Sequence, residues 1–118
     1  DVILSSPKKR SRQTAAIVAQ EVGFSPEKIM ETEKVKAMTP PEETIKAVTE
    51  HAGKERILIA GHLPSVAEVA SFLLTEGSKA LVEFEMGGCC RIDVEDLPTH
   101  SGHLIWYVTP EQLDLIAS

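Results

Sequence analysis

Several features are missing from this 118-residue sequence, and each absence excludes a class of protein. No apolar run reaches the roughly 20 residues that a membrane-spanning helix needs, so we expect no membrane partner. Positive charge is scarce: the formal net charge is −6, which argues against a general nucleic-acid-binding protein. There is also no internal repeat, low-complexity tract or domain linker. Residues 1–118 are therefore predicted to form a single domain.

Cysteine is scarce as well, and its placement is informative. Cys89 and Cys90 are neighbours, and a disulfide between neighbouring residues is badly strained. We therefore expect two free thiols, as in a reducing compartment, and a cytoplasmic location. Adjacent thiols chelate metal poorly, so a zinc site that combines them with His100 and His103 is disfavoured. No Cys-x5-Arg loop is present, which argues against a cysteine phosphatase.

The segment that organises the chain spans residues 56–74. Its first part, residues 57–60, is apolar and rich in branched side chains, which predicts a buried strand covered by helices on both faces. His62 follows the end of this run, and Pro64 then begins a stretch with helical periodicity. A strand that turns directly into a helix ends at the carboxyl edge of a sheet, where open α/β sheets bind their ligands.

The remaining elements follow from similar patterns. A hydroxyl cap at Ser6 before Pro7 predicts a helix whose first residue is Pro7, and Gly23 is expected to end it. Thr39 and Glu42 are expected to cap a second helix through a capping box. The other expectations are an end of that second helix at Gly53, strands at 2–4 and 104–108, a short edge strand within 28–35, a hairpin formed by 80–85 and 90–94, and a final short helix after Thr109.

This order of strands and helices predicts an α/β fold. We expect a three-layer α/β/α arrangement, with a mostly parallel sheet and helices on both faces. The sequence begins at Asp1, directly before a predicted strand and without a methionine. We interpret this start as an internal boundary, so a targeting signal cannot be judged from this end.

A first group of candidate functional residues lies in SSPKKRSRQT, residues 5–14. Arg10 is expected near the start of the first helix, where its guanidinium can grip the oxygens of a phosphate held at the helix N-terminus. A basic first turn is disfavoured by the helix dipole, which makes an anionic partner more plausible. The alternative is a solvated basic helix start without any ligand.

The second candidate is His62. Histidine serves well as a proton shuttle near neutral pH and as a hydrogen-bond donor to an oxyanion. Gly61 beside it allows close approach of a backbone or a ligand. The alternative is a core histidine satisfied by a loop carbonyl. If both strands are parallel neighbours, Arg10 and His62 lie at the same sheet edge and can converge on one phosphate.

These motifs resemble a known family. SSPKKRSRQTA is similar to the second signature of the histidine phosphatase, or phosphoglycerate-mutase-like, superfamily, and ILIAGHLPSV is similar to its third. The short segment that contains MTPPEE and the ending WYVTPEQL resemble the small SixA-type phosphohistidine phosphatases. The resemblance covers essentially the whole chain and implies a phosphoglycerate-mutase-like fold.

The resemblance implies an enzyme that works through a phosphohistidine intermediate. In the family, the phosphoryl group passes to a histidine in an Arg-His-Gly motif, and water then hydrolyses the intermediate to inorganic phosphate. By this resemblance Arg10 binds the phosphate, and His62 hydrogen-bonds the transferring phosphoryl group and stabilises its charge. The implied substrate is a phosphohistidine on a signalling protein, or else a small phosphate ester. No metal or organic cofactor is implied.

The sequence departs from the family in one respect: it contains no Arg-His-Gly motif. The contexts of His51, His100 and His103 do not match it, so the nucleophile is expected upstream of Asp1. The alternative is a non-catalytic module that binds phosphoproteins. No proton donor is assigned, because capping explains Glu42 without chemistry and a phosphohistidine leaving group is labile enough to need no strong acid.

Overall fold

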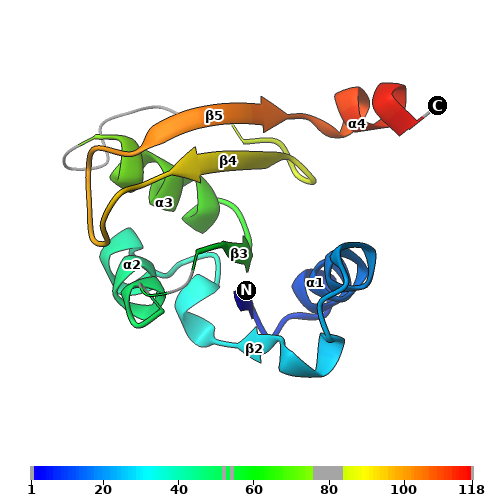
Figure 1. Ribbon diagram of the computed structural model, residues 1–118, viewed down its shortest axis with the longest axis horizontal. Helices are drawn as coiled ribbons and strands as arrows, with labels where there is room; N and C mark the ends of the chain where they lie inside the picture. The colour runs from blue at the N-terminus through cyan, green and yellow to red at the C-terminus, as the bar shows by residue number, and fades with distance from the viewer. Residues whose placement is uncertain (1, 52, 54, 76–83, 118) are drawn as a thin grey trace.

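The computed structural model describes residues 2–51, 53, 55–75 and 84–117 (Figure 1). Within these residues no helix is long and apolar enough to cross a membrane. The elements, in chain order, are β1 Val2–Ser5, α1 Lys9–Val22, the 3-10 turn η1 Pro26–Lys28, β2 Met30–Glu31, the 3-10 turn η2 Glu33–Val35, α2 Pro41–Thr49, β3 Ile57–Ala60, α3 Ser65–Leu74, β4 Cys89–Asp93, β5 His103–Val108 and α4 Pro110–Ala117.

β1 lies at the centre of a parallel sheet in the order β2-β1-β3. It pairs along its whole length with β3, with Val2 opposite Ile57 and Ser5 opposite Ala60. On its other edge it pairs with β2, the short edge strand predicted within residues 28–35. Parallel strands need crossover connections, and the helices α1 and α2 lie in those connections here.

The two faces of this sheet are covered by different helices. Ile3 points to the face that Ala15 and Ala19 of α1 cover. Successive residues of a strand point to opposite faces, so Val2 and Leu4 point the other way, where they pack with Val48 of α2. In Figure 1, α1 and α2 accordingly lie on opposite sides of the strands. The predicted three-layer α/β arrangement is confirmed.

β4 and β5 form a separate antiparallel ribbon. Residues 90–94, the second arm of the predicted hairpin, thus pair with the last strand, a pairing that the sequence did not predict. Residues 80–83 of that hairpin lie outside the described residues, and 84–85 are not in a strand. The loop between β4 and β5 is attached to the end of α3, where the backbone N–H of Gly102 donates to the carbonyl oxygen of Leu73 at 2.7 Å.

Three helix boundaries differ from the sequence prediction. α1 begins at Lys9, two residues after the predicted Pro7, because the hydroxyl of Ser6 bonds to His62 as well as to the backbone N–H of Lys8. Thr39 does not cap α2: its hydroxyl donates to the carbonyl oxygen of Glu33, and Pro40 occupies the cap position. α2 ends at Thr49, ahead of Gly53.

Gly23 ends α1 as predicted. It adopts the left-handed conformation with φ of 75°, and its backbone N–H bonds back to the carbonyls of the last turn. A side chain at this φ is strained, so glycine is the residue expected there. The final helix predicted after Thr109 is also present, as α4.

Candidate functional site

Two strand–helix junctions lie next to each other at the carboxyl edge of the parallel sheet. β1 and β3 end in register, and the backbone N–H of Ser6 donates to the carbonyl oxygen of Ala60 at 3.0 Å. The segments that lead into α1 and α3 therefore leave the sheet at the same edge. The predicted juxtaposition of these two junctions is confirmed.

Gly61 fits closely between two segments at this edge. A Cβ built on it would lie 2.9 Å from the carbonyl oxygen of Val35 and 3.0 Å from a methyl group of Val66. The close approach expected at this glycine is thus to the backbone of the segment after η2. It fixes the path of the chain immediately before His62.

His62 is held by two serines from the other junction. Its Nε2 lies 3.0 Å from the hydroxyl oxygen of Ser6 and 3.2 Å from that of Ser11. Ser6 is fully buried and Ser11 is 5% exposed. The hydroxyl oxygen of Ser6 also accepts a hydrogen bond from the backbone N–H of Lys8 at 3.2 Å. The imidazole is therefore anchored by its Nε2 edge to the start of α1.

The sequence analysis did not single out Ser6 or Ser11 as partners of His62. For Ser11 a signal was present: it precedes Ala15 and Ala19 at intervals of four residues, on the stripe of α1 that faces the sheet. A polar side chain on a buried stripe needs a partner. What the spacing could not supply was the partner, which is 51 residues away in the sequence.

Arg10 is the second residue of α1, next to Ser11, and its side chain is exposed. Within the described part of the chain that side chain has no ion-pair or hydrogen-bond partner. The first turn of α1 contains no acidic residue, and its N-terminus has no side-chain cap. Backbone N–H groups at such a helix start are available to an anion. That Arg10 and His62 meet over one anion stays a prediction.

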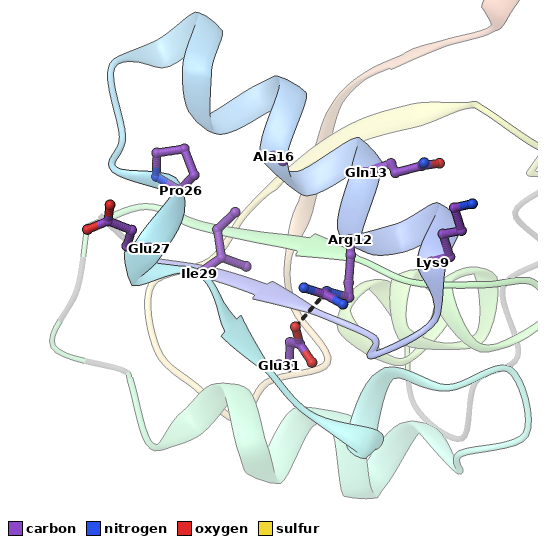
Figure 2. Close-up of a pocket in the computed structure, with 8 residues that line it drawn as sticks. All are labelled: Lys9, Arg12, Gln13, Ala16, Pro26, Glu27, Ile29 and Glu31. Carbon is purple, nitrogen blue, oxygen red and sulfur yellow. Dashed lines mark ion pairs between the residues drawn. The ribbon is translucent and has the colours of Figure 1, made fainter.

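A groove of about 510 Å³ runs along the outer side of α1 (Figure 2). Lys9, Arg12 and Gln13 line it from the helix, and Glu27 and Glu31 line it from η1 and β2. Figure 2 shows Arg12 turned toward Glu31, with 2.7 Å between its Nε and the carboxylate. The groove includes neither Arg10 nor His62, so it is distinct from the predicted site.

Glu43, in the first turn of α2, is paired with a lysine. The carboxylate of Glu43 accepts a hydrogen bond from the ammonium of Lys34 at 3.0 Å, and this bond and the lysine charge lower the pKa of Glu43. A carboxyl group held ionised cannot supply a proton near neutral pH. Among the described residues, no group of three His, Cys, Asp or Glu side chains is arranged to hold a metal ion.

No family model matches the sequence, and no curated protein matches it. One solved structure is similar: the protein histidine phosphatase SixA, complexed with tungstate. The TM-score is 0.71 at 21% sequence identity, over 96% of this chain and 70% of that chain. At this level of identity the similarity shows the fold, which is the phosphoglycerate-mutase-like α/β fold expected from the signatures in the sequence.

Proposed function

We propose that this chain is the phosphate-binding part of a phosphatase that acts through a phosphohistidine intermediate. The observation that carries the proposal is the anchoring of His62 beside the start of α1, the helix that also carries Arg10. The similar SixA structure is a complex with tungstate, a tetrahedral oxyanion with the shape of phosphate. A site with one guanidinium, one imidazole and free helix N–H groups has the chemistry to bind such an anion.

In the proposed reaction, Arg10 and His62 act on the phosphoryl oxygens. The guanidinium of Arg10 grips two of them, and the ring of His62 donates a hydrogen bond to another, so negative charge on the transferring group is stabilised. A nucleophilic histidine nitrogen attacks the phosphorus, the nitrogen–phosphorus bond of the substrate breaks, and the substrate histidine is released. Water then attacks the phosphorus, the nitrogen–phosphorus bond breaks, and inorganic phosphate leaves.

We place the nucleophile on an Arg-His-Gly strand upstream of Asp1. None of the histidines in residues 1–118 lies in that motif. The parallel sheet supports this placement, because β3 pairs with β1 along one edge and with no described strand along the other. A strand added at the free edge of β3 would end at the same carboxyl edge as His62 if it ran parallel to its neighbours.

The substrate we favour is a phosphohistidine on a signalling protein. Arg10 is exposed, so the proposed site is accessible to a group carried on a large partner. A small phosphate ester is the second candidate substrate. Cys89 and Cys90 are both free thiols, which supports a reducing compartment, and we propose the cytoplasm.

The first experiment replaces Arg10 in the complete protein. Arg10→Ala should lower the turnover of a phosphohistidine substrate by about 10²- to 10³-fold, since removing one donor to developing charge typically has that effect. Arg12→Ala is the matched control, because Arg12 lies on the same helix, is exposed, and pairs with Glu31. The proposal expects near-normal turnover for Arg12→Ala. Equal losses in both variants would remove Arg10 from the site.

A parallel experiment tests His62 and the binding-module alternative. His62→Ala should lower turnover to a similar extent, whereas His51→Ala, at the end of α2, should not. Trapping of a phosphorylated histidine in rapidly quenched enzyme would establish the intermediate. If orthovanadate shifts the amide signals around Arg10 and His62 but no phosphoenzyme or turnover is found, the chain is a phosphoprotein-binding module.

A further inference from the structure

The hydroxyl group of Ser6 has an unusual set of neighbours. Ser6 is fully buried, so its oxygen and its proton both require partners within the protein. The backbone N–H of Lys8 donates to the oxygen at 3.2 Å. The backbone N–H of Lys8 can only donate, so the proton of the Ser6 hydroxyl still needs an acceptor elsewhere.

Only one acceptor for that proton is found in the described part of the chain. It is Nε2 of His62, at 3.0 Å from the hydroxyl oxygen. A neutral imidazole carries its proton on one nitrogen and accepts at the other. If Nε2 carried the proton, the buried hydroxyl of Ser6 would have no acceptor. The penalty for such an unsatisfied group is large enough to bias the two tautomers by roughly tenfold or more.

We propose that Ser6 sets the tautomer of His62: Ser6 donates to Nε2, and the neutral ring therefore carries its proton on Nδ1. The hydrogen bonds then form a directed chain, from the N–H of Lys8 to the hydroxyl of Ser6 and on to the ring. Ser11 differs from Ser6, because in the described part of the chain no backbone N–H donates to its hydroxyl oxygen, which can therefore either accept from Nε2 or donate to it. Ser11 supports the position of the ring without determining its tautomer.

This inference deepens the proposed function and rests on it for its consequence. In the described part of the chain Nδ1 has no hydrogen-bond partner, so its proton is available to a ligand. His62 can then donate to a phosphoryl oxygen as a neutral ring. Ser6 acts through His62 and is a positioning residue.

The direct test is the tautomer itself, measured in the complete protein by ¹⁵N NMR of the histidine rings. The spectrum is recorded at alkaline pH, because the two tautomers exist only in the neutral ring. His100 is an internal reference, because its Nδ1 lies 2.7 Å from the carbonyl oxygen of Phe72, which can only accept. His62 should show the same pattern as His100. A proton on Nε2 of His62 would overturn the inference without any variant being made.

Three serine variants separate tautomer control from packing. Ser6→Ala should shift His62 away from the Nδ1–H form, while Ser11→Ala should keep it. Ser65→Ala is the matched control, because Ser65 is 1% exposed and its hydroxyl has no partner among the described residues. It should leave the tautomer unchanged. An unchanged tautomer in Ser6→Ala, with the His100 signals intact, would contradict the role of Ser6.

Binding of orthovanadate distinguishes failure of this inference from failure of the proposed function. Ser6→Ala should weaken orthovanadate binding by about fivefold, the range of one neutral hydrogen bond, and Ser65→Ala should not change it. If orthovanadate perturbs His62 but the proton is on Nε2, the proposed function stands and the inference fails. If the proton is on Nδ1 and orthovanadate leaves His62 unaffected, the tautomer assignment stands and the phosphate site fails.

Discussion

β1 and β5 are both short apolar strands, yet they differ sharply in burial. Val2, Ile3 and Leu4 of β1 are each at most 4% exposed. Ile105 and Trp106 of β5 are 48% and 43% exposed. The difference lies in the neighbours of each strand. β1 has a strand on both edges and a helix on both faces, whereas β5 pairs, among the described strands, with β4 alone.

The comparison shows which region holds the fold together. Burial of apolar surface is the dominant favourable term in folding, and it is concentrated around β1. A two-stranded ribbon is marginally stable by itself and depends on what it packs against. Here the loop between β4 and β5 is bonded to the end of α3, and we expect the ribbon to open before the parallel sheet does.

The largest predicted effect is the difference in stability lost when isoleucine is replaced by alanine in β1 and in β5. Ile3→Ala should lower the free energy of unfolding by about 3 kcal/mol, because it leaves a cavity between β1 and α1. Ile105→Ala should cost less than about 1 kcal/mol, because half of that side chain already faces solvent. Urea denaturation of both variants measures the two losses. Similar losses in the two variants would contradict the difference in burial between the strands and show that β5 is buried in solution.

A second prediction concerns the less exposed part of the ribbon. Cys90 on β4 lies opposite Tyr107, and burial raises the pKa of its thiol to about 11, with a further contribution from the charge of Cys89. Burial disfavours the charged thiolate, so the alkylation rate should keep rising with pH up to about 11. Relative to an ordinary solvated thiol, the thiolate population at pH 8 falls by at least roughly 100-fold.

The measurement is the rate of iodoacetamide labelling at Cys90 against pH, in the folded protein and in urea. Labelling in urea should level off near the ordinary thiol pKa, about 8.5. If the folded protein showed the same midpoint, Cys90 would be solvated and the ribbon more open than the structure indicates. Cys89 should show a smaller shift in the same direction, since burial raises its pKa too.

The parallel part of the fold could be predicted from the sequence because its signals are local. Residues 57–60 are apolar and branched, Gly23 provides a helix end, and each pattern lies within one element. Helix starts were predicted less well, since Thr39 bonds to Glu33 outside the helix it was expected to cap, and Ser6 bonds to His62 as well as to the backbone N–H of Lys8. The pairing of β4 with β5 depends on contacts between distant segments, which periodicity does not specify.

The candidate site was predicted in part for a similar reason. A histidine after a strand and an arginine after a capped turn are recognisable from the sequence, and the sheet register brings their junctions together. The serines that hold His62 were missed, because the bond from Ser6 joins residues 56 positions apart. The convergence of Arg10 and His62 on one anion, like the single-domain interpretation of the chain, stays a prediction.

The last prediction concerns the attachment of the ribbon to α3. A Cβ at Gly102 would lie 2.9 Å from the carbonyl oxygen of Leu73, which is the oxygen that accepts the hydrogen bond from Gly102 itself. Because a helix carbonyl cannot move aside cheaply, Gly102→Ala should cost about 2 kcal/mol. Gly53→Ala is the control, since a Cβ there meets nothing within 4 Å, and it should stay within about 0.5 kcal/mol of the parent.

Hydrogen exchange shows which part of the molecule is destabilised by Gly102→Ala. If the ribbon is attached to a stable parallel sheet, the amides of β4 and β5 should lose protection while those of β1 keep theirs. Loss of protection in both sheets together would mean that the two regions unfold as one cooperative unit. The difference in burial between β1 and β5 would then describe the surface of the molecule and not the order in which its parts open.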